Sequence, residues 1–365
     1  MKKLIHFLAR IKGLNHLNFF EDGAYLFSFP MFLLDLHLFK ELIEETEKSL
    51  GKENAKKIFL TGGYVQGIFA VNFFRDRFKI MPEESDHRFY LEQGQSVGFG
   101  ELVLEYMNSD KSELKFVSIH HPKVEETYTN YYHHGLIIGV CKILFSKNYI
   151  LENYLEGNKI VYILKESEDK SHFLKNLDFD YSFKNLSLNN FSKKKNFFYE
   201  KLVRRNKNLF FTDKTGTFFD GEFQIFTLLS IFILFYNLSL KIDKNKTKKI
   251  YYDLGKKFIK MKIDYIKTFS PKNTLQQYLQ ISSLFGFEKF DIKIQDNKLI
   301  VKILDSNWEK ISKKLILEKQ DMDFNYFTIG LIEGFIEENL KKNILNKEVK
   351  NFGGRIYFKF EVSEQ

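Results

Sequence analysis

Cysteine is almost absent from this chain of 365 residues, which contains only Cys141. A single cysteine excludes an intrachain disulfide and any zinc cluster that needs several cysteine ligands. Structural disulfides belong to oxidising compartments, so we expect a cytoplasmic protein.

Long hydrophobic runs are also missing. The run from Phe226 to Leu238 holds about 13 mostly apolar residues, whereas a helix needs roughly 20 to cross a bilayer. We therefore expect a buried core helix there and no transmembrane segment. The stretch from Met1 to Leu14 is interrupted by His6, Arg10 and Lys12 and has no small-residue cleavage site, which indicates an amphipathic helix rather than a signal peptide.

Catalytic motifs are missing as well. No glycine-rich loop ends in Lys-Ser or Lys-Thr, which excludes the phosphate-binding loop of nucleotide hydrolases. Gly62 and Gly63 lie inside a predicted helix, where we expect them to allow close helix packing. No nucleophile, acid and base occur in a recognisable arrangement. We therefore expect a protein that is not an enzyme and holds no cofactor.

Aromatic residues, in contrast, are abundant. The chain contains 41 Phe and 19 Tyr, and 44% of its residues are hydrophobic. This composition excludes a disordered chain and indicates cores packed with bulky rings. The length favours two or three domains, and half of the chain is long enough to form one hydrophobic core.

The sequence also repeats itself. Four residues recur 195 positions later: Tyr131, Gly135, Gly139 and Asn148 correspond to Tyr326, Gly330, Gly334 and Asn343. Shorter blocks keep the same order upstream at offsets of 192 and 188: 57–59 and Gly63 correspond to 249–251 and Gly255, and 98–99 corresponds to 286–287. Self-similarity over nearly the whole chain is typical of a duplicated domain.

Each copy follows the same predicted plan. Apolar residues at helical or alternating spacing predict a strand, long helices, a hairpin, a helix with two glycines and a closing strand. In the first copy these elements are 24–29, 32–50, 54–78, 98–119, the helix from 131, and 160–164. In the second copy they are 221–226, 228–240, 247–269, 271–284, 287–304, 326–340 and 356–362, with Gly353 and Gly354 turning the chain before the last strand. Residues 196–207 are predicted to form a helix that corresponds, in the second copy, to the predicted N-terminal helix of the first.

The order of these elements resembles the 4-vinyl reductase domain, which is related in structure to core subunits of the TRAPP vesicle-tethering complex. The resemblance covers Phe19 to Leu164 and Phe218 to Val362. It implies an α+β fold in which an antiparallel sheet is packed by helices, dimerisation, and an apolar pocket for a small hydrophobic ligand. We expect a first domain at 1–165, a linker at 166–195, and a second domain at 196–365, arranged as an internal pseudo-dimer. A further homodimer remains open.

The chain departs from this family at the family's zinc site. The family's cysteine ligands align with Lys350 and Phe358 in the second copy and with Tyr154 and Tyr162 in the first. Lysine and phenylalanine cannot replace a thiolate, so we expect no metal there. The adjacent pairs His120-His121 and His133-His134 each offer about one ligand to a site, because neighbouring side chains point in different directions. We expect no metal at these histidines either.

The first copy carries more hydrogen-bonding groups than the second at the start of its glycine helix. Residues 131–134 read Tyr-Tyr-His-His, whereas 326–329 read Tyr-Phe-Thr-Ile. A ligand pocket needs polar groups that converge on a cavity, whereas packing needs only apolar volume. We therefore predict a small-molecule site near Tyr131, His134 and Cys141.

The alternative reading, that these three are ordinary core and surface residues, stays open. In the related tethering subunits a cysteine carries an acyl chain, but its position does not clearly match Cys141, so we favour a buried small hydrophobe there. In the second copy Glu333 precedes Gly334. Its carboxylate would lie either at a pocket or dimer seam, or on a solvated helix face.

The chain is basic, with a formal charge of +9 and a pI near 9.1. Its densest basic patch supplies the candidate anion-binding residues, which are Lys193, Lys194, Lys195, Arg204 and Arg205. These residues would bind nucleic acid or an anionic membrane surface, or they belong to a solvated connector. Two function classes therefore remain: a non-enzymatic small-molecule-binding or regulatory protein, and a scaffold or tethering protein that holds proteins, membrane or nucleic acid.

Overall fold

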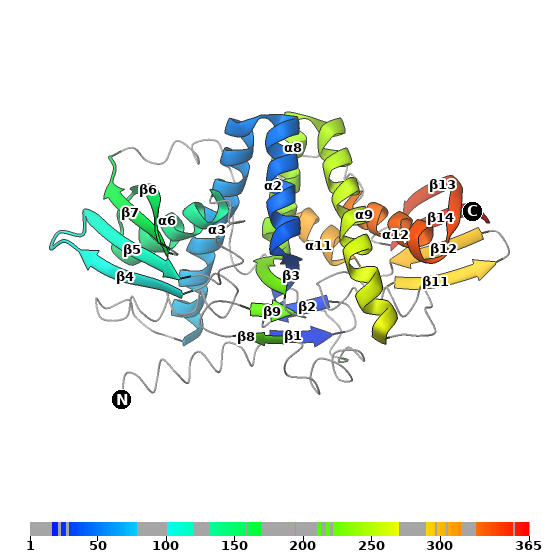
Figure 1. The fold of residues 1–365 in the computed structure, drawn as a ribbon, viewed down its shortest axis with the longest axis horizontal. Helices are drawn as coiled ribbons and strands as arrows, with labels where there is room; N and C mark the ends of the chain where they lie inside the picture. The colour runs from blue at the N-terminus through cyan, green and yellow to red at the C-terminus, as the bar shows by residue number, and fades with distance from the viewer. Residues whose placement is uncertain are drawn as a thin grey trace.

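The computed structural model describes residues 17–20, 23–26, 29–78, 101–119, 131–157, 159–168, 194, 210–212, 217–219, 222–269, 290–295, 298–303, 306–314, 326–352 and 355–364. Figure 1 shows central helices standing above a central sheet, with a smaller sheet at either side. The main hydrophobic core runs through the central helices and continues into the second copy's outer sheet.

The central sheet takes three strands from each copy. Its order is β1 (Leu17–Phe20), β2 (Gly23–Leu26), β3 (Phe29–Asp35), β10 (Glu222–Leu228), β9 (Thr217–Phe219) and β8 (Phe210–Thr212). Neighbouring strands are antiparallel, and at the middle of the sheet Leu33 of β3 lies opposite Phe226 of β10. Main-chain hydrogen bonds therefore join the two copies.

Four long helices rise from this sheet. They are α2 (Leu36–Leu50) and α3 (Lys52–Phe78) from the first copy, and α8 (Leu229–Ile242) and α9 (Lys244–Phe269) from the second. The predicted start of α2 at Phe32 was wrong, because residues 32–35 form the end of β3 and the helix begins at Leu36. Every residue of β3 is buried, so its sequence shows no alternation that would separate it from the helix.

Each copy also forms a four-stranded outer sheet with the same strand order. The first is β4 (Glu101–Met107), β5 (Glu113–Ile119), β7 (Lys159–Glu166) and β6 (Tyr149–Glu156). The second is β11 (Phe290–Gln295), β12 (Lys298–Ile303), β14 (Arg355–Glu364) and β13 (Lys342–Phe352). The predicted hairpins are confirmed as β4–β5 and β11–β12.

The glycine helices are α6 (Tyr131–Phe145) and α12 (Tyr326–Asn339), and they lie directly against α3 and α9. A Cβ atom on Gly63 would lie 1.9 Å from the carbonyl oxygen of Tyr132, and one on Gly330 would lie 2.0 Å from that of Tyr252. Real Cβ atoms do not approach other atoms so closely, so only glycine allows the backbones to meet. The expected close helix packing at Gly63 is confirmed.

The sequence patterns missed β1, β6, β8, β9, β13 and the helix α11 (Asn307–Lys314). In each copy a strand lies between the glycine helix and the closing strand, so the predicted direct turn was incomplete. A bulge in β13 between Ile344 and Asn346 inserts Leu345. This insertion changes the offset between the copies from 195 to 196, so that Tyr162 of β7 corresponds to Phe358 of β14.

The α+β class with antiparallel sheets packed by helices is confirmed. In the part of the chain that the structure describes, none of the helices is long and apolar enough to cross a membrane. The predicted helices at 1–14, 196–207 and 271–284 lie outside the described residues.

Candidate functional site

The first copy's outer sheet and α6 enclose a hydrophobic cluster separate from the main core. Its buried members are Leu114, Phe116, Ile137, Cys141, Phe145, Tyr149, Ile160, Tyr162 and Leu164. In the second copy the corresponding strands belong to the main core instead, through buried residues such as Val301 and Phe358. We call the nine residues of the first copy the satellite cluster.

A buried polar pair lies against the satellite cluster. His133 on α6 is only 1% exposed, and its Nδ1 lies 2.8 Å from the hydroxyl oxygen of Tyr162 on β7. Burial raises the pKa of Tyr162, so its hydroxyl stays protonated at neutral pH. The pair is therefore hydrogen-bonded and its phenol carries no charge.

The neighbouring His134 is not satisfied in the same way. Its ring meets that of Tyr162 edge to face, with centroids 5.8 Å apart. Its Nε2 is buried and has no hydrogen-bond partner within the described residues. Burial, and to a lesser degree the charge of Lys56, lowers the pKa of His134 to about 4, so the ring is neutral at pH 7. A buried polar atom without a partner costs about 1–3 kcal/mol, which marks a place where a ligand group or water would be stabilising.

Cys141 belongs to the satellite cluster and is fully buried. Burial raises the pKa of its thiol, so the thiolate that nucleophilic chemistry requires is not formed at neutral pH. Tyr131 is half-buried and packs against the main core instead. Burial raises the pKa of Tyr131 to about 12, with a further contribution from its hydrogen bond to Glu47. The structure thus places the ring of His134 against Tyr162, places Cys141 in the same satellite cluster as Tyr162, and places Tyr131 on a different core.

The second copy keeps a polar side chain at only one of these four positions. His133, His134, Cys141 and Tyr162 correspond to Thr328, Ile329, Ile336 and Phe358. All four of the second copy's residues are buried. The polar atoms of His134, Cys141 and Tyr162 are therefore not required by the shared packing of helix on sheet.

Glu333 is neither solvated nor at a contact between copies. Its side chain is 5% exposed, accepts a hydrogen bond of 2.6 Å from the Tyr252 hydroxyl, and pairs at 2.8 Å with Lys347. These partners lie on α9 and β13 of the same copy. Glu333 thus joins α12 to α9 and β13.

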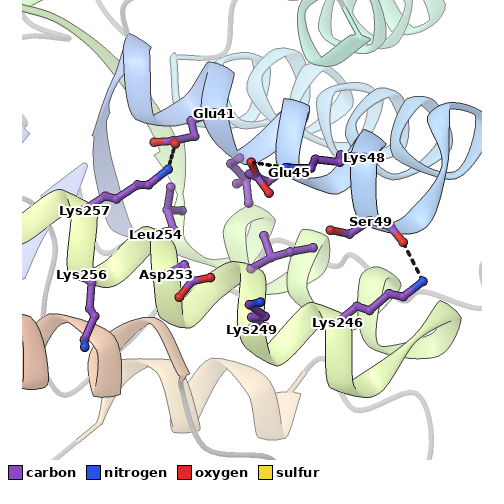
Figure 2. Close-up of a pocket in the computed structure, with 12 residues that line it drawn as sticks. Glu41, Glu45, Lys48, Ser49, Lys246, Lys249, Asp253, Leu254, Lys256 and Lys257 are labelled. Atoms are coloured by element: carbon purple, nitrogen blue, oxygen red, sulfur yellow. Dashed lines mark hydrogen bonds and ion pairs between the residues drawn. The ribbon is translucent and has the colours of Figure 1, made fainter.

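A groove lies between α2 of the first copy and α9 of the second, and no sequence pattern pointed to it. It encloses about 490 Å³. Its lining residues are Glu41, Leu42, Glu45, Lys48, Ser49, Lys246, Lys249, Ile250, Asp253, Leu254, Lys256 and Lys257. Figure 2 shows charged side chains from both helices facing this groove.

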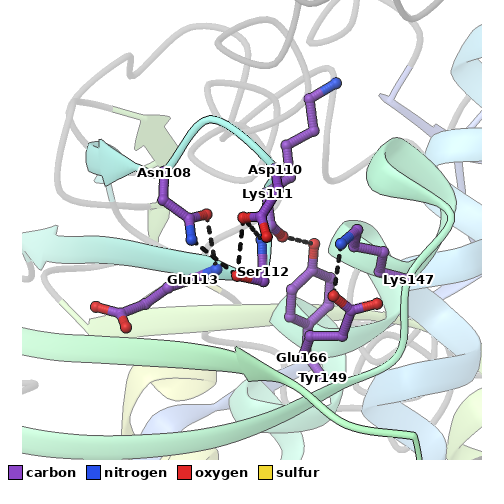
Figure 3. Close-up of polar contacts among 8 residues, drawn as sticks. All are labelled: Asn108, Asp110, Lys111, Ser112, Glu113, Lys147, Tyr149 and Glu166. Carbon is purple, nitrogen blue, oxygen red and sulfur yellow. Dashed lines mark hydrogen bonds and ion pairs between the residues drawn. The ribbon is translucent and has the colours of Figure 1, made fainter.

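The predicted polar turn between β4 and β5 is closed by its own side chains (Figure 3). The side-chain oxygen of Asn108 accepts a hydrogen bond from the backbone N–H of Glu113. Asp110 accepts bonds from both the backbone and the hydroxyl of Ser112, and these bonds lower the pKa of Asp110. Tyr149 donates to the carbonyl of Lys111 at 2.8 Å. This bond joins the turn to a member of the satellite cluster.

The predicted anion-binding patch falls largely outside the described residues. These exclude Lys193, Lys195, Arg204 and Arg205, whereas Lys194 is described and exposed. His120 and His121 are also outside. Among the described residues, no three His, Cys, Asp or Glu side chains gather closely enough to hold a metal ion.

No family model matches this chain, and no curated protein matches it. Among solved structures, it is similar to the phenol-responsive sensory domain of the transcription activator PoxR with phenol, at 16% identity and a TM-score of 0.36, over 45% of this chain and 91% of that one. It is also similar to a trafficking protein particle complex subunit 3 from Naegleria fowleri covalently bound to palmitic acid, at 14% identity and a TM-score of 0.23, over 36% of this chain and 96% of that one. Each similarity covers less than half of this chain.

Proposed function

We propose that this protein is a non-enzymatic small-molecule-binding or regulatory protein built from two 4-vinyl reductase-like copies. The ligand would lie in the first copy, beside His134, Cys141 and the satellite cluster. The Nε2 of His134 carries this proposal, because it is buried without a hydrogen-bond partner within the described residues, and a polar group of a ligand would stabilise it.

The chemistry of the surrounding groups supports an uncharged ligand. The raised pKa values of Tyr162 and Cys141 and the lowered pKa of His134 all keep these groups neutral at pH 7. An ion placed among them would lose its hydration without gaining a counter-charge. A small hydrophobic molecule with one hydrogen-bonding group would instead bury its apolar body and satisfy His134.

The same groups argue against catalysis. A general base works best when its pKa lies near the operating pH, and that of His134 lies near 4. A nucleophilic cysteine needs a lowered pKa, whereas burial raises that of Cys141. We therefore propose binding without chemistry, and without a metal or cofactor.

We further propose that the two copies form an internal pseudo-dimer. Two equivalent ring pairs support this arrangement: the centroids of Phe39 and Phe59 are 6.0 Å apart, and those of their counterparts Phe232 and Tyr251 are 5.4 Å apart. The central pairing of β3 with β10 supplies the contact that a dimer of single copies would use.

Native mass spectrometry of the freshly purified full chain tests the ligand proposal. We expect a bound small molecule that survives gentle desolvation in the unmodified protein and is lost in His134→Phe, which keeps bulk and removes the ring nitrogens. His37→Phe makes the same change on an exposed position of α2 and is expected to retain the molecule. Retention in a folded His134→Phe variant, or no bound molecule in the unmodified protein, would contradict the proposal.

A further inference from the structure

The seam between α2 and α9 has a counterpart between α8 and α3, because the copies correspond element by element. Leu42 corresponds to Phe235, and Leu254 corresponds to Gly62. A Cβ on Gly62 would lie 2.1 Å from Cε1 of Phe235, so the aromatic ring fills the α8–α3 seam. Leucines occupy both positions at the α2–α9 seam, where the groove of about 490 Å³ remains. Packing of the fold alone therefore does not require this groove.

The open seam is charged where its counterpart is apolar. Glu41 and Glu45 of α2 correspond to Leu234 and Leu238 of α8. Both glutamates line the groove, whereas Leu234 is buried and Leu238 packs against the main core. The two seams therefore differ in the charge of their side chains as well as in the volume left open.

The apolar floor of the groove offers little to a ligand. Leu42, Ile250 and Leu254 line it, and all three are already buried in the main core. Covering them removes almost no further apolar surface from water, so hydrophobic stabilisation of a ligand would be small. Recognition in this groove must come from charges and hydrogen bonds.

Three ammonium groups among the lining residues, those of Lys48, Lys246 and Lys249, lack a close carboxylate partner within the described residues (Figure 2). Lys48 and Lys246 reach their nearest carboxylates only at 3.8 Å, and Lys246 also donates to the carbonyl of Ser49 at 3.1 Å. Lys249 has no hydrogen-bond or ion-pair partner in the described part of the chain. Like charges gathered in a concave site attract a multivalent anion.

Carboxylates also line the groove. Glu45 pairs only with Lys48 at 3.8 Å, and Asp253 accepts no hydrogen bond within the described residues. Carboxylates repel an anion but accept hydrogen bonds from hydroxyl groups. The lining therefore suits a ligand that carries both an anionic group and several hydroxyl donors.

We propose that the α2–α9 groove binds a phosphorylated polyol, either free or as a lipid headgroup. Its phosphate lies among Lys48, Lys246 and Lys249, and its hydroxyls donate to Glu45 and Asp253. This site is distinct from the one beside His134 and binds a ligand of the opposite character.

Calorimetry on the full chain tests this proposal with glucose 6-phosphate, inorganic phosphate and glucose as probes. We expect glucose 6-phosphate to bind more tightly than phosphate, and glucose not to bind. Lys249→Gln removes one charge-assisted bond and should weaken glucose 6-phosphate binding about tenfold. Asp253→Asn should weaken glucose 6-phosphate, because one carboxylate acceptor oxygen is replaced by an NH₂ donor, but strengthen phosphate, because a repulsive charge is lost.

Lys57→Gln is the matched control, since Lys57 corresponds to Lys249 at the closed seam and is also exposed. It should leave binding unchanged. Equal weakening by Lys57→Gln and Lys249→Gln would show a response to net charge alone and overturn the proposal, as would absence of binding at about 10 mM glucose 6-phosphate. Vesicles with phosphatidylinositol 4-phosphate form a second arm: sedimentation that Lys249→Gln abolishes would assign the same chemistry to a lipid headgroup.

Discussion

The ammonium of Lys262 on α9 lies 2.9 Å from the carboxylate of Asp35 at the end of β3, and both side chains are buried. The two residues come from different copies. Asp35 directly precedes α2, but its side chain makes no capping hydrogen bond to that helix. Its carboxylate instead accepts a hydrogen bond from Lys262 of the other copy. This pair is a buried ion pair that joins β3 to α9.

We expect Lys262→Met to lower the free energy of unfolding by about 3–5 kcal/mol, because it leaves a buried carboxylate without its ammonium. Lys257→Met breaks the exposed pair with Glu41 and should cost less than about 1 kcal/mol. Urea unfolding of both variants measures the difference. Adding Asp35→Leu to Lys262→Met should restore much of the loss, and failure to do so would mean that the pair itself is not the cause.

Protonation of His134 should make the fold less stable in mild acid. Its folded pKa of about 4 lies below the ordinary value of 6.5, so the unfolded chain binds the proton more readily. Stability should therefore fall as the pH drops from about 6.5 to 4, by roughly 2–3 kcal/mol from this group. His134→Phe should flatten this part of the profile, whereas the exposed His37→Phe should leave it unchanged. An identical slope in both variants would assign the dependence to other groups.

Two glycines of α12 should respond differently to alanine. A Cβ on Gly330 would lie 2.0 Å from a backbone carbonyl oxygen of α9, whereas one on Gly334 would meet its nearest atom at 3.1 Å. We expect Gly330→Ala to cost about 2–3 kcal/mol, because the helices must separate. Gly334→Ala should fall within about 1 kcal/mol of the unmodified protein, since the gain in helix propensity offsets a mild contact. Thermal unfolding of the two variants compares them, and equal midpoints would mean that α12 shifts freely on α9.

The sequence predicted those features of the fold that are periodic or repeated. The glycines at 63, 135, 255 and 330 marked the helix pairs, because close backbone approach excludes other residues. It missed β6 because residues 152–156 are exposed along their whole length and show no apolar alternation. It missed β13 for the same reason, since Leu345 sits at a bulge and is 68% exposed.

The candidate site could be predicted only in part. The histidines of α6 differ from their counterparts in the sequence, and that difference is why a ligand site was predicted near His134. The sequence did not show that Tyr131 faces the main core, nor that Tyr162 of β7 reaches His133, because both depend on how the helix rotates on the sheet. The α2–α9 groove depends on which side chains meet across two copies, such as Phe235 with Gly62, and no local pattern contains that information.

The pairing of β3 with β10 has a consequence for any attempt to produce one copy alone. A fragment that ends before residue 210 would keep β3 but lose its partner, and the strand would present a row of unpaired N–H and C=O groups. Exposed, fully apolar strand edges recruit other chains and promote aggregation. Because both halves belong to one chain, this edge stays covered at any protein concentration, whereas separate halves would expose it whenever they dissociated.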